Sequence, residues 1–189
     1  MRYFAKLISA GLLAAGLLAG TALAEGISVQ KVEGRTGDSN YQMTADFDVS
    51  FNFVVEQALM RGVTLHFISE FSLSHPRWYW LDETVAQSEQ TTRLSYNALT
   101  RQYRIAHGAL FQNFSTLEDA LAVVGHCVAA PVPLALLKKD SNYVLSARLS
   151  LDVSRLPKPL QVNALTGNEW NLDSGWYQLI TRPADGRSN

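Results

Sequence analysis

Three stretches of the chain alternate apolar and polar residues with a period of two: residues 41–51, 63–73 and 143–153. Such alternation places all the apolar side chains of a strand on one face. Each stretch therefore predicts an antiparallel strand with one buried face and one solvent-exposed face. Leu149, at the centre of the third stretch, is predicted to be fully buried.

Shorter patterns predict further strands. Ile27 and Val29 indicate a short first strand, and residues 94–105 are typical of a hairpin with a turn near their middle. The polar run that ends near Thr92 shows no alternation, so no strand is predicted there.

Two helices are predicted from their end signals. Asn52 fits the N-cap of a helix over residues 53–61, which Gly62 ends. Ser115 opens a capping box (Ser-Thr-Leu-Glu) that begins a helix to about Val124. Each helix has apolar residues at helical spacing, which indicates one face packed on a core.

Residues 156–177 contain two prolines, two tryptophans and two turn signals. Pro157 and Pro159 lack an N–H donor and fix φ, which predicts a stiff, extended bridge at a sheet edge. Apolar and polar residues alternate over residues 160–164, so a short strand is predicted there. Two turns then lead to a closing strand that begins at Trp176.

These elements predict the fold class. Eight or nine short strands with few helices are typical of a mainly β domain, here residues 25–189 as a single unit. The favoured architecture is an antiparallel β-sandwich, loosely immunoglobulin-like, with two or three short helices. The alternative is an α+β fold with one antiparallel sheet and helices on one face.

Residues 1–24 have the features of a signal peptide. Arg2 and Lys6 precede an apolar run over residues 7–18, and Ala22-Leu23-Ala24 is a small-x-small cleavage site. Cleavage after Ala24 predicts a periplasmic protein. The apolar run is shorter than the ~20 residues of a membrane span, although an uncleaved anchor is the alternative. No later segment is apolar enough to span a bilayer.

Charge and cysteine content narrow the function classes. The chain has 16 basic and 17 acidic residues, so it lacks the basic excess of a nucleic-acid-binding protein. Cys127 is the single cysteine and cannot form an internal disulfide. In an oxidising compartment such a thiol is predicted to be buried. A nucleophilic role beside His126 lacks a third, orienting group.

No motif predicts catalysis, a cofactor or a metal ion. The four histidines lack the spacing of metal ligands, and His66 and Glu70 would lie ~13 Å apart on one strand. Asp46 and Asp48 are a candidate carboxylate pair, but no cleft can be assigned to them. The sequence therefore favours a protein that is not an enzyme.

Aromatic residues provide the candidate interaction patch. Arg77, Trp78 and Trp80 lie within four residues of one another, and Trp170 is the proposed further anchor. Exposed tryptophan and arginine side chains are typical of interaction hot spots. The alternative interpretation is that the tryptophans plug the end of the sandwich.

Four segments carry a resemblance to a known family: HPRWYWLDE (75–83), LSYNALTRQYR (94–104), FSTLEDAL (114–121) and residues 156–177. They resemble an uncharacterised family of exported proteobacterial proteins, a domain of unknown function. The resemblance implies no activity, cofactor or catalytic residue. Its members tend to be encoded beside a membrane sensor kinase and a response regulator, which implies a link to envelope signalling.

The sequence as a whole favours a soluble periplasmic binding or protein-interaction module without catalytic activity, accessory to envelope signalling. Its expected partner is an envelope or periplasmic protein. One alternative is a small envelope hydrolase or carbohydrate-active enzyme. Another is a structural or chaperone-like accessory of an envelope protein.

Overall fold

The computed structural model describes residues 26–77, 79, 82–139 and 141–183. The predicted signal peptide therefore lies outside the described residues. The strands are β1 (Gly26–Thr36), β2 (Asn40–Ser50), β3 (Leu65–His75), β4 (Glu83–Asn97), β5 (Gln102–His107), β6 (Leu110–Phe114), β7 (His126–Val128), β8 (Val132–Pro133), β9 (Tyr143–Leu151) and β10 (Tyr177–Thr181). The α-helices are α1 (Phe53–Met60), α2 (Leu117–Gly125) and α3 (Lys158–Thr166), with short 3-10 turns at Leu134–Leu136 and Val153–Arg155.

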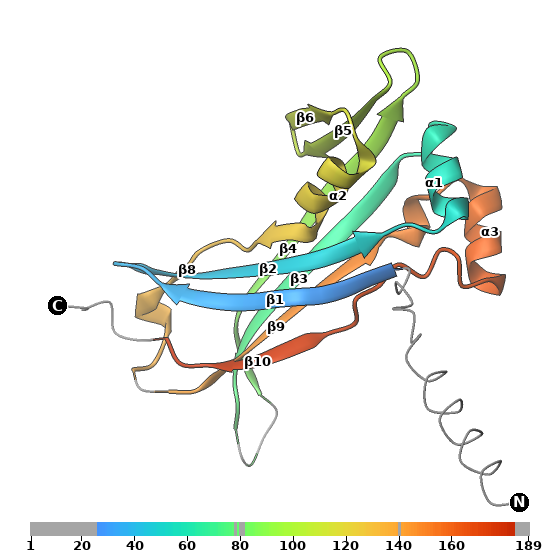
Figure 1. The fold of residues 1–189 in the computed structure, drawn as a ribbon. Helices are drawn as coiled ribbons and strands as arrows, with labels where there is room; N and C mark the ends of the chain where they lie inside the picture. Colours follow the sequence, from blue (N-terminus) through green and yellow to red (C-terminus); the bar gives the residue numbers. More distant parts are fainter. Residues whose placement is uncertain (1–25, 78, 80–81, 140, 184–189) are drawn as a thin grey trace, which may run out of the picture.

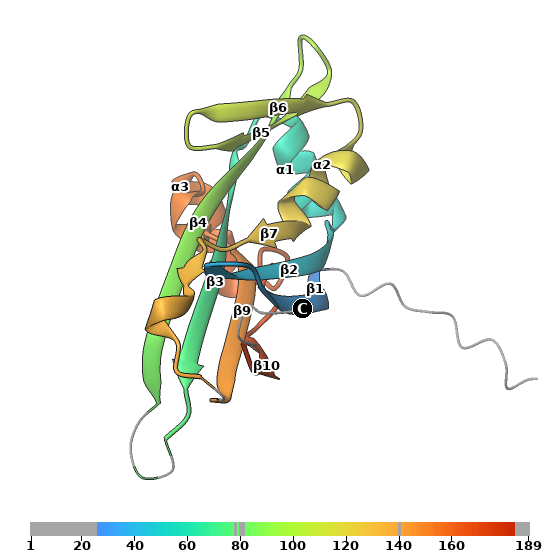
Figure 2. The same cartoon turned by 90° about the vertical axis from the view of Figure 1, so that its left-hand side faces the viewer.

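Two antiparallel sheets form the body of the molecule (Figures 1 and 2). The larger has the strand order β10-β9-β3-β4-β5-β6, and the smaller has the order β1-β2-β7 with β8 also paired to β2. The predicted antiparallel sandwich with a few short helices is confirmed.

The core lies between the sheets and is built by the three alternating stretches. Their inward side chains are buried in all three strands, and Leu149 is 1 % exposed as predicted. The buried members are Tyr41, Met43, Ala45, Phe47 and Val49 on β2, Leu65, Phe67, Phe71 and Leu73 on β3, and Tyr143, Leu145, Ala147, Leu149 and Leu151 on β9. A period of two therefore identified the buried face of each strand correctly.

Both predicted helices form, with one correction at a cap. The Asn52 side chain accepts a hydrogen bond from Val55 N at 3.0 Å, as an N-cap residue does. α2 is capped by Thr116 rather than Ser115, because Thr116 Oγ1 accepts from the backbone N–H of Asp119 at 3.1 Å. The capping pair is thus one residue later than predicted, and Asp119 takes the place of glutamate.

The polar run before Thr92 is a strand, which the sequence did not reveal. Residues 83–91 of β4 pair with β3 only, since β5 begins to pair at Thr92. Along this part most β4 side chains are exposed or half-buried, so no apolar alternation is required. Charged and amide side chains on such an edge hinder pairing with another chain.

Residues 158–166 form helix α3, so the predicted extended bridge and short strand are wrong. Pro157 is the N-cap and Pro159 lies in the first turn, where a missing N–H costs no intrahelical hydrogen bond. Five alternating residues were too few to distinguish the two periods. The predicted closing strand is confirmed as β10.

Within residues 26–183, apart from the four internal positions not described, no helix is long and apolar enough to cross a membrane.

Candidate binding surface

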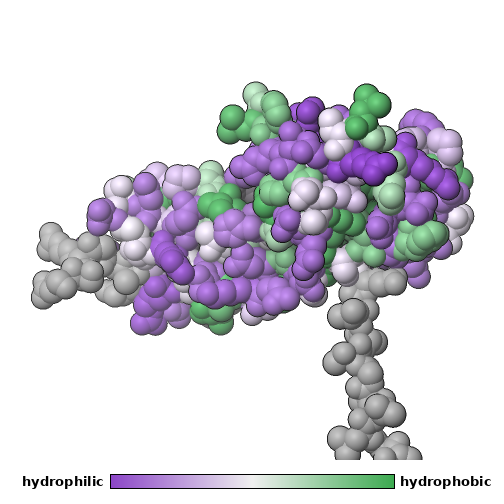
Figure 3. Space-filling model, turned by 45° about the horizontal axis from the view of Figure 1, so that its top comes forward, coloured by the Kyte–Doolittle hydropathy of each residue, from purple (hydrophilic) through white to green (hydrophobic). Residues whose placement is uncertain are grey.

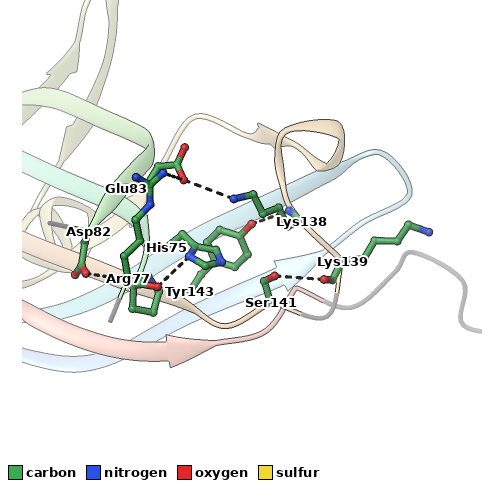
Figure 4. Close-up of polar contacts among 9 residues, drawn as sticks. His75, Arg77, Asp82, Glu83, Lys138, Lys139, Ser141 and Tyr143 are labelled. Carbon is green, nitrogen blue, oxygen red and sulfur yellow. Dashed lines mark hydrogen bonds and ion pairs between the residues drawn. The ribbon is translucent and has the colours of Figure 1, made fainter. Parts of the chain in front are cut away.

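The predicted patch around Arg77 is described only in part. Trp78 and Trp80 lie outside the described residues, so their place in a binding surface stays a prediction. Arg77 is exposed just after β3 and forms an ion pair with Glu83, which also lies 3.6 Å from Lys138 Nζ (Figure 4). Arg77 is thus engaged in a local charge cluster at the end of β3.

Trp170 is not an exposed anchor. It is 2 % exposed and shares a groove with Val63 and Leu160, beside the beginning of β3. Arg77 follows the other end of this eleven-residue strand, roughly 35 Å away. Trp170 therefore belongs to the core, and the four predicted residues do not make one patch.

A different surface is presented by β10, the last strand of the larger sheet. Among the described residues β10 pairs with β9 alone, from Tyr177 opposite Ala147 to Thr181 opposite Tyr143. The strand reads Tyr-Gln-Leu-Ile-Thr and carries no charge. Ile180 is 74 % exposed. An uncharged edge strand of this kind is a template for pairing with another chain.

β10 pairs with a strand whose inward side chains are buried. The β9 residues opposite it include Tyr143, Leu145 and Ala147, each at most 1 % exposed. On the inner face, the Thr181 hydroxyl lies 2.7 Å from the Tyr41 hydroxyl and joins β10 to the smaller sheet. β10 is therefore anchored on one side by β9 and through Thr181 by the smaller sheet.

Gly34 makes the contact between Tyr41 and Thr181 possible. A Cβ atom at Gly34 would lie 1.7 Å from the Tyr41 hydroxyl oxygen, so only glycine leaves room for the ring. A residue of β1 thus helps to fix β10, although the two strands belong to different sheets.

Ionic contacts hold the segment of the chain that precedes β10. Arg148 donates from Nε to Asp173 Oδ1 at 2.9 Å and from Nη2 to Oδ2, and its Nη1 lies 3.5 Å from Glu70. Hydrogen bonding from Arg148 lowers the pKa of Asp173, and the same bonds raise the pKa of Arg148. The Trp176 ring lies 5.9 Å from Arg148 Cζ, so the chain that leads into Tyr177 is also held.

Two other edge strands, β1 and β6, differ from β10. β1 carries Lys31, Glu33 and Arg35 and has a register shift between Val29 and Lys31, two features that discourage pairing. β6 is uncharged like β10, but its partner β5 has only Ile105 buried. Of these three edges, β10 is therefore the uncharged one that pairs with a buried strand.

A comparison with protein-family models places this arrangement in a family. Residues 24–180 match the model described as Domain of unknown function (DUF4390). The chain belongs to this family. The match extends from before β1 to Ile180, so the DUF4390 domain includes both sheets and nearly all of β10. No curated protein and no solved structure matched the chain.

The titratable groups that sequence analysis singled out are dispersed over the DUF4390 domain. Asp46 Oδ1 lies 2.6 Å from His126 Nδ1 on the exposed face of β2 and β7. Cys127 is buried on the opposite face, as predicted, and burial raises the pKa of its thiol to about 11. His126 and Cys127 therefore point to opposite faces of β7, and the thiol stays protonated at neutral pH.

His66 and Glu70 lie on the outer face of β3 and face different charged groups. Burial, together with Arg155 and Arg93, lowers the pKa of His66, so its imidazole is neutral at pH 7. Glu70 faces Arg148 instead. In the described part of the chain no group of three or more His, Cys, Asp or Glu residues has the arrangement of a metal site.

Proposed function

We propose that this protein is a periplasmic binding module without catalytic activity, which takes up an extended segment of an envelope or periplasmic protein along β10. The observation that carries the proposal is the edge itself: β10 is uncharged, pairs on one side only among the described residues, and is fixed to buried β9. Added strands bind through main-chain hydrogen bonds, with specificity from alternate side chains.

The side chains of β10 indicate what such a segment would look like. Ile180 is exposed on the outer face, and Tyr177 is 43 % exposed at the end where β10 begins. A partner strand with β-branched or aromatic residues opposite these positions would gain cross-strand contacts. Each main-chain hydrogen bond contributes about 0.5–1.5 kcal/mol net, so a five-residue edge supports reversible binding.

The location in the periplasm rests on the leader-like residues 1–24. Their positive start, apolar run and Ala-Leu-Ala site are the features of an exported chain. A protein exported to the periplasm would meet envelope proteins there, so we expect its partner to be one of them. A role beside a membrane sensor kinase, which the family resemblance implies, would make the bound segment part of an envelope signalling protein.

An absence of catalysis is proposed from the placement of the reactive groups. Among the residues that the structure describes, the Asp46–His126 pair has no hydroxyl or thiol nucleophile as a hydrogen-bond partner, and the nearby Cys127 faces the core. An acyl-transfer or glycosidic reaction needs a nucleophile or a second carboxylate held against the first group. Strand pairing at β10 needs neither a nucleophile nor a second carboxylate.

The test is a direct binding experiment with defined peptides. Seven-residue peptides that alternate Val or Ile with Thr, without charge, would be immobilised and probed with residues 25–189. Binding is expected, and it should be lost when alternate peptide nitrogens are methylated, because methylation removes the N–H donors. Equal binding of methylated and unmethylated peptides, or no binding at all, would overturn strand pairing.

Variants locate the binding on β10. Ile180→Lys adds a charge to the edge and should abolish peptide capture, with little change in stability because the residue is 74 % exposed. Leu110→Lys makes the same change at a 79 % exposed residue on β6 and serves as the matched control. If Leu110→Lys lost peptide capture while Ile180→Lys kept it, the peptide would bind at β6, and the assignment to β10 would be refuted.

A further inference from the structure

The outer face of the larger sheet carries two exposed arginines without an acidic partner, Arg93 on β4 and Arg104 on β5. Neither forms an ion pair with a described residue. Elsewhere in the same sheet Arg148 is paired with both Asp173 and Glu70. Like charges on neighbouring strands repel each other unless an anion lies between them. The two arginines therefore indicate a place for an anion that the chain does not itself supply.

The register of β4 and β5 creates a hollow between these arginines. Arg93 lies opposite Ala106, and Arg104 lies opposite Ser95. The two arginines thus occupy diagonal positions, which are roughly 7–8 Å apart in an antiparallel pair. Ser95 and Ala106 stand at the other two corners, and their small side chains leave space. The result is a pocket of about 270 Å³ lined by all four residues, which we call the Arg93–Arg104 pocket.

Both arginines have contacts on the side of the pocket where β6 begins. Arg93 donates from Nη2 to the carbonyl oxygen of Gly108 at 3.0 Å, in the turn that precedes β6. Arg104 donates from Nε to Asn113 Oδ1 at 3.2 Å, and its Cζ lies 4.8 Å from the centroid of the Phe111 ring. Within the described part of the chain, these bonds use one of the five N–H groups of each guanidinium. Several donors of each remain for a ligand.

The pocket has a polar side and an apolar side. Thr64 and Ser95 line it beside the arginines and carry hydroxyl groups, whereas Leu110 and Phe111 line it from β6 and are 79 and 60 % exposed. β5 and β6 lie together at one end of the molecule (Figures 1 and 2), and Figure 3, which turns that end forward, shows hydrophobic residues among hydrophilic ones there. An apolar wall beside two cations suits an anion that carries an organic group.

The surroundings of the pocket are positive. His66 of β3 lies opposite Arg93, and burial, Arg155 and Arg93 together lower the pKa of its imidazole. Asp152 is the carboxylate closest to Arg155, and the two already form an ion pair. Among the described residues that line the pocket, none is acidic. An incoming anion would therefore meet cations without competition from a carboxylate.

We propose that the Arg93–Arg104 pocket binds a phosphate monoester, with the phosphate between the two guanidinium groups and the organic part against Phe111. A monoester phosphate carries about −1.5 to −2 charges at pH 7, which two arginines balance. The planar fork of a guanidinium also matches two phosphate oxygens. A carboxylate has a single charge and would leave one cation unbalanced. The pocket and β10 lie toward opposite edges of the sheet, so the proposal does not rest on strand binding.

The proposal is tested with phenyl phosphate as the probe, titrated into residues 25–189 at constant ionic strength so that general screening does not change. Saturable shifts of the Nε–Hε resonances of Arg93 and Arg104 are expected in NMR spectra. Inorganic phosphate should bind about tenfold more weakly, because it lacks the ring that Phe111 would cover. Benzoate should also bind about tenfold more weakly, because it has only one charge.

Three results of these titrations would overturn the proposal. Absence of saturable shifts with phenyl phosphate would refute the site. Equal affinity for inorganic phosphate would refute the ester and leave the free anion as the ligand. Equal affinity for benzoate would refute the preference for phosphate.

Variants locate the binding in the pocket. Arg93→Gln and Arg104→Gln should each weaken phenyl phosphate binding at least about tenfold, through the loss of charge-assisted hydrogen bonds. Arg182→Gln is the matched control. Arg182 is exposed, has no ion pair with a described residue and donates from Nε to Asn142 Oδ1 at 3.0 Å, much as Arg104 does to Asn113. It follows β10, at the opposite edge of the sheet. Equal weakening in Arg182→Gln would indicate unspecific attraction and contradict the pocket.

A second change tests the pocket without removal of an arginine. Ala106→Glu places a carboxylate between Arg93 and Arg104, where the phosphate is proposed to lie. This variant should lose phenyl phosphate binding by at least about tenfold, while its melting temperature equals or exceeds that of the wild type because a new ion pair forms. Unchanged binding in Ala106→Glu would refute the pocket. Peptide capture at β10 should stay intact in all these variants, so failure of one proposal is distinguishable from failure of the other.

Discussion

Replacement of Trp170 by alanine should destabilise the protein severely, because this side chain is part of the core. Trp170 is 2 % exposed and contacts the region between α1 and α3. A buried tryptophan removes up to ~250 Å² from water. At about 25 cal/mol per Å² the burial is worth at most ~6 kcal/mol, and water entering the adjoining groove reduces the loss. We expect a decrease of about 3–5 kcal/mol in the free energy of unfolding.

Urea unfolding followed by far-UV circular dichroism measures this change. The midpoint should fall while the m-value stays constant, and the melting temperature should drop by roughly 10 °C. Trp176→Ala is the matched control, since Trp176 is 49 % exposed and its ring centroid lies 5.9 Å from Arg148 Cζ. The control should lose about 1 kcal/mol or less. A loss below about 1 kcal/mol for Trp170→Ala would refute its placement in the core.

Four further outcomes are expected. Leu149→Ala should cost about 2–5 kcal/mol in denaturant unfolding, because Leu149 is 1 % exposed at the centre of β9; a cost below about 1 kcal/mol would show that the faces of β9 are inverted. Cys127, with its pKa raised to about 11, should react with a thiol reagent at pH 8 only as fast as the protein unfolds, and rapid labelling of the native state would contradict its burial. Since Arg148 lowers the pKa of Asp173, this carboxylate stabilises the fold above pH ~4 and the contribution disappears as the pH falls through the lowered value. Asp173→Asn should therefore reduce stability at pH 7 and flatten its acid dependence, and an unchanged pH profile would argue against the pair. Intact-mass measurement on a periplasmic fraction should give Glu25 as the first residue, whereas retention of Met1 in a membrane fraction would indicate an uncleaved anchor.

Local signals in the sequence identified much of the fold. The alternation over residues 41–51, 63–73 and 143–153 predicted three core strands with the correct buried faces, and Asn52 marked the start of α1. These predictions succeeded because a strand buried on one face must repeat every two residues, and a helix N-terminus needs an acceptor for its free N–H groups.

Signals shorter than the elements they describe gave errors. Five alternating residues were taken for a strand where α3 forms, because the two prolines also fit the first turn of a helix. The first half of β4 was missed, because a strand with few buried side chains shows no apolar pattern. Thr116 rather than Ser115 capped α2, since both residues can accept the same bond.

The candidate binding surface depended on contacts between distant segments. The sequence by itself determined that this is a mainly β chain with a leader-like start, a buried cysteine and a core built from period-two strands, because those properties follow from residue type and local spacing. Only the tertiary structure decided that Trp170 is buried while Ile180 is exposed, and that β10 ends a sheet. Strand order and burial depend on which distant segments pair, and no local pattern in one chain encodes that pairing.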